Sequence, residues 1–208
     1  VLVTGAAGFL GRYVVAGLLQ DPQHKIIAMD MIPADKISAI FSYSHRILPL
    51  QFDLESLLGG SDFALNCFKD TLRGVHSVIH VAGIVDTRET AAVTHKLDRV
   101  NVQATSVLVD IAAECGVSSF VHISSVGAII ESKLTVTVGL KAWIEVLGLR
   151  SSMLSTMKMS TYGKTKLAAE RIVLAKGATT TGLKVAVLRP HVVWGRGDTL
   201  STEVLLNW

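Results

Sequence analysis

The sequence is poor in charge and in cysteine. Only 18% of its 208 residues are charged, against roughly 25% in an average globular chain, and 20 Lys+Arg against 17 Asp+Glu leave a formal net charge of +3. This small excess excludes a strongly basic nucleic-acid-binding protein. The hydrophobic share of 50% excludes intrinsic disorder, which needs low hydrophobicity and high net charge. We therefore expect a folded protein with a large core and no nucleic-acid partner.

Long apolar runs and targeting signals are also lacking. The most apolar long stretch, residues 134–149, is interrupted by Lys141 and Glu145, so no membrane-spanning helix is predicted. The chain opens directly in Val-Leu-Val, without a Met and without the pattern of a signal peptide. The two cysteines, Cys67 and Cys115, are far apart and have no metal-ligand spacing. They predict buried free thiols, a reducing compartment and no metal site.

Short apolar runs alternate with longer amphipathic ones, which is typical of βαβ units around a parallel sheet. The short runs are continuously apolar, as expected when helices cover both faces of the sheet. We predict an α/β fold over residues 1–208, a Rossmann-type doubly wound parallel sheet with helices on both faces. Strands are expected at residues 1–4, 25–30, 46–52, 75–81, 117–123 and 183–188, and helices from the first glycines to about 20, from about 89 to 114, and at 161–176. Residues 126–160 have a mixed pattern and receive no assignment.

A glycine-rich turn joins the first strand to the first helix. Glycines at spacings of three and three allow a tight turn, a close approach of the backbone to a pyrophosphate, and close packing of helix on strand. The helix N-terminus then offers free N–H groups to phosphates. Asp30 ends the second strand 19 residues after the last glycine, where an acid bonds the ribose hydroxyls and repels a 2′-phosphate, so NAD is favoured over NADP. The alternative is a purely structural turn. The predicted cofactor-binding residues here are Gly5, Ala7, Gly8, Phe9, Leu10, Gly11 and Asp30.

Two further strand ends belong to the same predicted site. Asp53 and Leu54 follow the third strand and would lie beside the adenine, although Asp53 is equally suited to cap a short helix. Ala82 and Gly83 end the fourth strand with small residues, which lets a dinucleotide lie against it. His80, just before them, is interpreted as a packed core histidine rather than a catalyst.

Tyr162 and Lys166 are four residues apart on a predicted helix and therefore share one face. A nearby ammonium and a positively charged nicotinamide would both lower the pKa of the phenol, which is otherwise a poor base at neutral pH. Lys166 can also hold the nicotinamide ribose. Ser124 and Ser125 end the fifth strand and can supply a hydroxyl to the substrate oxygen.

Taken together, these motifs resemble the extended short-chain dehydrogenase/reductases, and most closely the 3β-hydroxysteroid dehydrogenase/isomerase group. The resemblance implies that Tyr162 is the catalytic acid/base, that Lys166 is its electrostatic partner, and that Ser125, next to Val126, is the hydroxyl donor. Asn101 would order the region under the site, or else bond a neighbouring helical backbone. The matching segments are Thr4-Gly5-x-x-Gly8-x-x-Gly11, Asp30, Asp53-Leu54, His80-x-Ala82-Gly83, Asn101-Val102-x-x-Thr105, Ser124-Ser125, Tyr162-x-x-x-Lys166 and Arg189-Pro190.

The chain departs from this family in three places. Ser125 and Tyr162 are 37 residues apart, longer than the family leads us to expect. Trp194 stands where a Tyr is usual, and an aromatic stacking role would survive that change. The family continues beyond the position of Trp208, so we expect a fragment that holds the NAD(P)-binding domain while the C-terminal substrate-binding portion is largely absent.

The resemblance implies an NAD-dependent dehydrogenase that oxidises a secondary alcohol of a small hydrophobic substrate, a 3β-hydroxysteroid or sterol. The alternatives are a nucleotide-sugar epimerase or dehydratase with bound NAD, and a non-catalytic NAD-binding scaffold. The family also implies a location on the cytoplasmic side, and it leaves open a homodimer and, for the intact protein, association with the endoplasmic-reticulum membrane.

Overall fold

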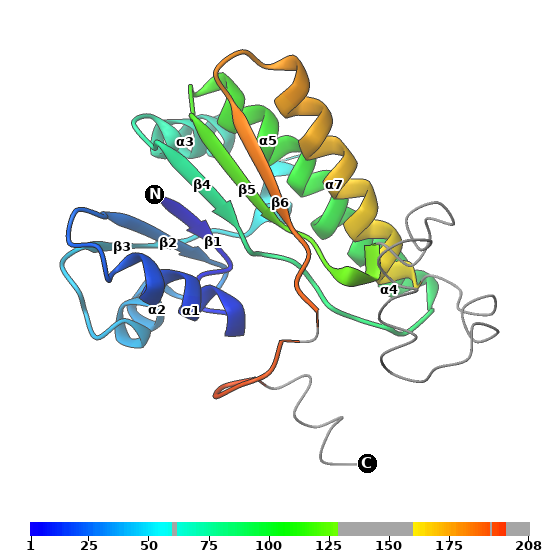
Figure 1. The fold of residues 1–208 in the computed structure, drawn as a ribbon, viewed down its shortest axis with the longest axis horizontal. Coiled ribbons are helices and arrows are strands. Elements are labelled where there is room, and N and C mark those ends of the chain that lie inside the picture. Colours follow the sequence, from blue (N-terminus) through cyan, green and yellow to red (C-terminus); the bar gives the residue numbers. More distant parts are fainter. Residues whose placement is uncertain (60–61, 129–159, 192, 199–208) are drawn as a thin grey trace, which may run out of the picture.

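A six-stranded parallel sheet organises the chain (Figure 1). The computed structural model describes residues 1–59, 62–128, 160–191 and 193–198. The strand order is β3-β2-β1-β4-β5-β6, and every neighbouring pair is parallel. This is the doubly wound Rossmann order, so the predicted fold class is confirmed. The strands are β1 (Leu2–Thr4), β2 (Ile26–Asp30), β3 (Ile47–Gln51), β4 (Ser77–His80), β5 (Ser119–Ile123) and β6 (Lys184–Leu188).

Helices cover both faces of this sheet. Figure 1 shows α1 (Phe9–Leu18) and α2 (Ala34–Ile40) on one side, with α3 (Asp62–Leu72), α5 (Ala104–Glu114) and α7 (Thr161–Thr179) on the other. Shorter segments complete the connections: η1 (Leu54–Leu57), α4 (Ala91–Leu97), η2 (Asp98–Gln103) and η3 (Val126–Ala128). All six predicted strands are present. Helices α2 and α3 were not predicted, because neither follows a recognisable motif.

Alternation along the strands divides the core into two clusters. Leu2 of β1 packs with α3 and α5, whereas its neighbour Val3 packs with α1 and α2. The larger cluster includes Phe68, Leu108 and Phe120. Because successive side chains of a strand point to opposite faces, a sheet with helices on both sides needs continuous apolar strands. This explains the apolar runs in the sequence.

The predicted long helix over residues 89–114 is in fact three segments. α4 runs into η2, a stretch of π-helix, which continues as α5. A π-helical turn is rare and is frequently found at functional sites, and η2 contains Asn101. The hydrophobic period does not reveal this change, because a π-turn displaces the helical register by only one residue.

The prediction of two buried thiols is wrong. Cys67 is exposed on α3, and Cys115 is partly buried at the end of α5. Among the described residues, no helix combines the length and hydropathy needed to cross a membrane. Within the same ranges, no group of three or more His, Cys, Asp or Glu side chains could hold a metal ion.

The contact between α1 and β1 allows a direct test. A Cβ added to Gly11 would lie 2.0 Å from the carbonyl oxygen of Gly5, whereas one added to Gly17 on the same helix would meet nothing within 4 Å. Gly11→Ala is therefore expected to lower the free energy of unfolding by about 1–3 kcal/mol. The control Gly17→Ala is expected to raise it by about 0.5–1 kcal/mol. Urea unfolding measures both, and equal effects would contradict the packing described here.

Candidate functional site

The glycine turn leaves the first helix open at its N-terminus. Gly5 has a φ of +65°, and a Cβ on it would lie 2.8 Å from the backbone of Ala82, so only glycine fits. Gly8, the residue before α1, makes no side-chain cap, and the first turn of α1 contains no acidic residue. The N–H groups of this turn therefore suit an anionic ligand.

Asp30 lies directly beside this turn. One carboxylate oxygen accepts a hydrogen bond of 2.9 Å from the backbone N–H of Ala7, and the other accepts one of 2.8 Å from Met31. The end of β2 thus places a negative charge next to the pyrophosphate position. That arrangement suits ribose hydroxyls and opposes an added phosphate.

Asp53 and Leu54 have local structural roles. The Asp53 carboxylate accepts a hydrogen bond of 3.0 Å from the N–H of Glu55 and so caps η1, and Leu54 is buried. The capping alternative is therefore found, while contact of these residues with an adenine stays a prediction.

The end of β4 connects the glycine turn to the helix that carries Tyr162. Ala82 contacts Gly5, and a Cβ on the next residue, Gly83, would lie 3.2 Å from Asn101 Oδ1 and 3.7 Å from Lys166 Nζ. A side chain at Gly83 would therefore crowd Asn101. The predicted cofactor turn and the predicted catalytic lysine thus lie on either side of this strand end.

A chain of buried hydrogen bonds crosses the same region. His80 Nδ1 lies 2.7 Å from Thr4 Oγ1, and His80 Nε2 lies 2.9 Å from Thr105 Oγ1. Because the Thr105 hydroxyl donates to the carbonyl of Asn101, it must accept from His80, which places the ring hydrogen on Nε2. Burial, together with His122 and Lys166, lowers the pKa of His80 well below its usual value, so the ring is neutral. His80 is therefore a core histidine, as the sequence predicts.

Asn101 supports the backbone around the site. Its side chain accepts from the N–H of Ile84 at 2.8 Å and donates to the carbonyl of Ile84 at 2.9 Å. It also donates to the hydroxyl of Thr165, which bonds the carbonyl of Tyr162. The side chain of Asn101 thus bonds residues 17 and 64 positions away and not the backbone of its own helix, while its role in ordering the site stays a prediction.

Tyr162, Lys166 and Ser125 come together at the start of α7. Ser160 caps this helix by accepting from the N–H of Gly163 at 3.1 Å. Burial raises the pKa of Tyr162, and a hydrogen bond with Ser125 opposes that rise. The net direction is upward, opposite to the lowering that the Tyr-x-x-x-Lys spacing predicts, because desolvation of the phenolate outweighs the other effects. Burial also lowers the pKa of Lys166 to about 8.

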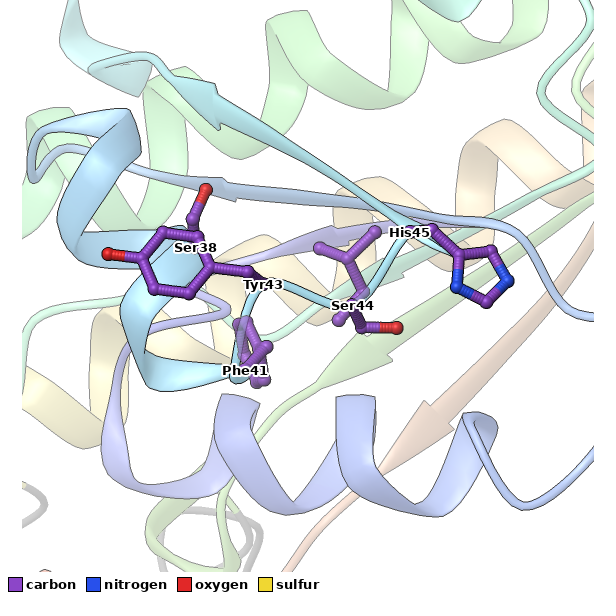
Figure 2. Close-up of a pocket in the computed structure, with 6 residues that line it drawn as sticks. Ser38, Phe41, Tyr43, Ser44 and His45 are labelled. Carbon is purple, nitrogen blue, oxygen red and sulfur yellow. The ribbon is translucent and has the colours of Figure 1, made fainter.

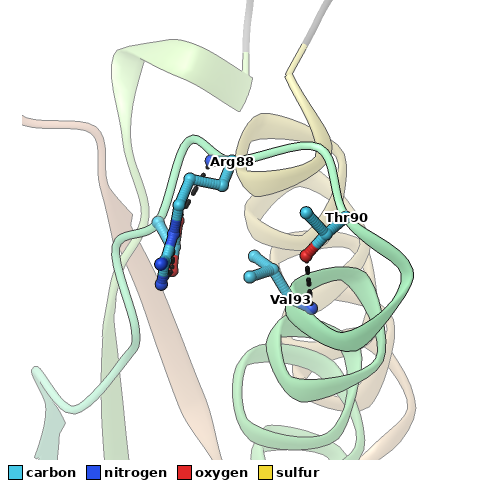
Figure 3. A network of polar contacts seen from close by, with 4 residues as sticks. Arg88, Thr90 and Val93 are labelled. Carbon is cyan, nitrogen blue, oxygen red and sulfur yellow. Dashed lines mark hydrogen bonds and ion pairs between the residues drawn. The ribbon is translucent and has the colours of Figure 1, made fainter.

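The loop after β4 is held by contacts that the sequence did not reveal (Figure 3). Arg88 folds back onto Asp86 with a hydrogen bond of 2.6 Å and holds the pKa of that carboxyl at about 2, while Thr90 caps α4. Glu89 accepts from the N–H of Thr161 at 3.0 Å and also from its hydroxyl, which ties the loop to the residue before Tyr162. Glu89 and Thr161 are 72 positions apart, so the sequence gives no local signal of their contact.

The pocket formed by the connection between α2 and β3 contains none of the predicted site residues. It has a volume of about 240 Å³ and opens at the start of β3 (Figure 2). The site residues instead lie at the carboxyl ends of the strands, the edge where open α/β sheets bind ligands. The pocket is lined by Ser38, Phe41, Tyr43, Ser44, His45 and Ile47.

Two residues that the sequence singled out lie at the margins of the described structure. Arg189 follows β6 and pairs with Glu170. Trp194 is 73% exposed, and the adjacent Gly195 packs near the ring of Phe9. Most of the unassigned segment over 126–160, including Trp143, lies outside the described residues.

Comparison with known proteins identifies the family. The model of the 3-beta hydroxysteroid dehydrogenase/isomerase family matches residues 2–208. A 3-beta-hydroxysteroid dehydrogenase of Mycolicibacterium neoaurum is 28% identical over 216 residues, covering 100% of this chain and 51% of that protein. A 3 beta-hydroxysteroid dehydrogenase/Delta 5-->4-isomerase of Mycobacterium tuberculosis (strain H37Rv) is 30% identical over 203 residues, covering 95% of this chain and 48% of that protein.

Solved structures agree with this assignment at the level of the fold. MoeE5 in complex with UDP-glucose and NAD is similar with a TM-score of 0.69 and 27% identity, over 96% of this chain and 56% of that one. The chain spans about half the length of the relatives that it matches. By its sequence match and its parallel sheet, the chain belongs to the 3-beta hydroxysteroid dehydrogenase/isomerase family.

Proposed function

We propose that this chain is the cofactor-binding half of an NAD-dependent oxidoreductase that oxidises a secondary alcohol. The observation that carries the proposal is the hydrogen bond between half-buried Tyr162 and Ser125. Tyr162 lies on α7, the helix that also brings Lys166 against Gly83. Gly83 is one residue from the contact between Ala82 and the glycine turn. The acid/base group and the cofactor turn therefore lie at the same edge of the sheet.

The described residues fit a dinucleotide. The uncapped start of α1 would hold the pyrophosphate, Asp30 the ribose next to the adenine, and Lys166 the nicotinamide ribose. Gly5 and Gly11 leave no room for a side chain because they pack against Ala82 and the carbonyl of Gly5, and Gly8 between them lets the backbone approach the ligand closely. The chemistry supplied by bound NAD is acceptance of a hydride from the carbon that carries the hydroxyl.

The protein groups then have separate roles. Ser125 donates a hydrogen bond to the substrate oxygen, and Tyr162 accepts the hydroxyl proton. The ammonium of Lys166 stabilises the phenolate that this transfer requires, which matters because burial raises the pKa of Tyr162. The substrate class that we propose is a small hydrophobic 3β-hydroxysteroid or sterol, supported by the names of the relatives. Location of the intact protein at the endoplasmic-reticulum membrane is part of the same proposal.

A nucleotide-sugar epimerase or dehydratase is the second candidate. It is favoured by the similarity to MoeE5, which was solved with UDP-glucose and NAD. The same three side chains would serve it, because both reactions begin with removal of a proton and a hydride. Measuring the turnover of a 3β-hydroxysteroid and of UDP-glucose by the full-length protein separates the two candidates. Turnover of the steroid alone supports the first, and turnover of UDP-glucose alone supports the second.

Tyr162→Phe is expected to lower kcat for alcohol oxidation about 10²–10⁴-fold, because it removes the group that accepts the proton. The measurement is NADH formation by the full-length protein with a 3β-hydroxysteroid. Tyr43→Phe is the matched control, since Tyr43 is 73% exposed at the other edge of the sheet, and its kcat should stay unchanged. A Tyr162→Phe protein as active as this control would refute the proposed mechanism.

Lys166→Met is expected to abolish activity and at the same time to stabilise the protein. Burial lowers the pKa of Lys166 from 10.5 to about 8, so below pH 8 the folded state carries a desolvated charge that costs about 3 kcal/mol. The folded state binds fewer protons than the unfolded state between the two values, so this cost disappears as the pH rises from about 8 to 10.5. The gain in unfolding free energy on substitution should therefore be largest below pH 8.

Denaturant unfolding at several pH values measures this effect. Lys176→Met on the same helix is the control, because Lys176 is ion-paired with Asp110 and its removal is not expected to stabilise the protein. A Lys166→Met variant that is less stable than the unchanged protein at pH 7 would contradict the expected cost.

A further inference from the structure

α7 presents a third side chain in line with the two predicted catalytic ones. Tyr162, Lys166 and Glu170 are spaced four residues apart, so they lie along one face of the helix. Lys166 is 4% exposed and Glu170 is 2% exposed. A carboxylate and an ammonium buried one turn apart are costly unless each has partners. The partner of Glu170 comes from outside the helix.

Arg189 binds the Glu170 carboxylate with both ends of its guanidinium. Arg189 Nε donates to Glu170 Oε2 at 2.9 Å, and Arg189 Nη2 donates to Oε1. This two-point geometry fixes orientation as well as distance. Arg189 directly follows β6, so the ion pair fastens the end of that strand to α7.

The backbone on either side of Arg189 holds Ser125. The carbonyl of Leu188 accepts from the N–H of Ser124 at 2.7 Å, and the carbonyl of Pro190 accepts from the N–H of Val126 at 3.0 Å. Ser125 lies between these two bonds. A displacement of the segment around Arg189 would therefore move Ser125 relative to Tyr162.

We propose that the Glu170–Arg189 ion pair is a positioning device, which sets Ser125 against Tyr162 and keeps a fixed negative charge one helical turn from Lys166. This inference rests on the proposed function of the three catalytic residues. Glu170 and Arg189 are positioning residues in it, because they act through Ser125 and Lys166 and touch no reacting atom.

The charged and titratable groups around Lys166 show why the charge of Glu170 matters. The charge of Lys166 lowers the pKa of His122 of β5 and of His80 of β4, and any positive charge on these rings would oppose that of the lysine. Both rings are buried, and burial holds the pKa of His122 at about 3, so both stay neutral. Arg171 and Arg189 act on Glu170. Among the described residues, Glu170 supplies the negative charge that keeps Lys166 protonated.

The Glu170 carboxylate stays charged despite its burial. Burial raises the pKa of Glu170, but hydrogen bonds with Arg189 and Ser124 and the charges of Arg189 and Arg171 outweigh that effect, and the pKa lies below its usual value. The ion pair is therefore intact throughout the neutral range, where the proposed reaction would run.

Glu170→Gln tests the role of the charge in the full-length protein. With a 3β-hydroxysteroid and NAD, kcat is expected to fall about 10- to 100-fold, while KM changes less, because the reacting groups are misplaced by a fraction of an ångström. The titration of Lys166, followed by NMR of labelled lysine side chains and assigned with Lys166→Met, is expected to move down by about 1 pH unit. Glu170→Asp keeps the charge but is too short for both contacts with Arg189, so kcat should fall while the titration of Lys166 is largely retained.

Asp110→Asn is the matched control. It removes the ion pair of Asp110 with Lys176, which also fastens α7 to a neighbouring element but lies away from the site. It should change kcat less than twofold and leave the titration of Lys166 in place. If Asp110→Asn reproduces both effects of Glu170→Gln, or if Glu170→Gln leaves both unchanged, the positioning role is refuted.

Two further arms keep the outcome decisive. If Glu170→Gln does not fold, Arg189→Lys takes its place, because it keeps the positive charge but loses the two-point contact with Glu170. A fall of kcat of at least about tenfold supports the proposal. A change in kcat no larger than that of Asp110→Asn refutes it. If Tyr162→Phe is fully active, the proposed function itself fails. If Tyr162→Phe is inactive while Glu170→Gln is normal in kcat and in lysine titration, only the positioning role fails.

Discussion

The close approach of backbone to backbone at the glycine turn is the constraint on which the site depends. Gly11 lies against the carbonyl of Gly5, and Gly5 lies against Ala82, with no space for a Cβ at either glycine. These contacts bring the start of α1 to the carboxyl end of β4. The small residue Gly83 then lets Lys166 reach the same place. The glycine turn and α7 thus lie on either side of Ala82 and Gly83.

Buried polar groups provide the second layer of organisation. Thr4, His80, Thr105 and Asn101 form a directional chain of hydrogen bonds from β1 to η2, and Asn101 continues it to α7. Buried polar groups are costly when unpaired, so such a chain tolerates few alternative arrangements. His122 differs, because neither of its ring nitrogens has a hydrogen-bond partner among the described residues. Its ring lies beside that of His80, and the charge of Lys166 contributes to the lowering of its pKa.

The inner strands could be predicted because they are largely buried between helices, and burial leaves a continuous apolar run in the sequence. The edge strand β6 keeps such a run although Lys184, Ala186 and Leu188 are exposed. Helices α2 and α3 left no such mark. The π-helical interruption at Asn101 was also missed, because it adds one residue to a helix whose apolar pattern continues on both sides. Burial of Cys67 was predicted from the general preference of thiols for the core, but Cys67 lies on the exposed face of α3.

The sequence by itself determined approximately where the strands begin and end, the glycine turn, the position of Asp30 at a strand end and the Tyr162–Lys166 spacing. Each of these depends on residues close together in the chain. Only the tertiary structure decided the partners of these residues and the direction of their pKa shifts. Arg189 forms an ion pair with Glu170, 19 positions away in the sequence, and Glu89 accepts a hydrogen bond from Thr161, 72 positions away. The pKa of Tyr162 rises because the phenol is partly buried, and burial is set by every element packed around a side chain rather than by its neighbours in sequence.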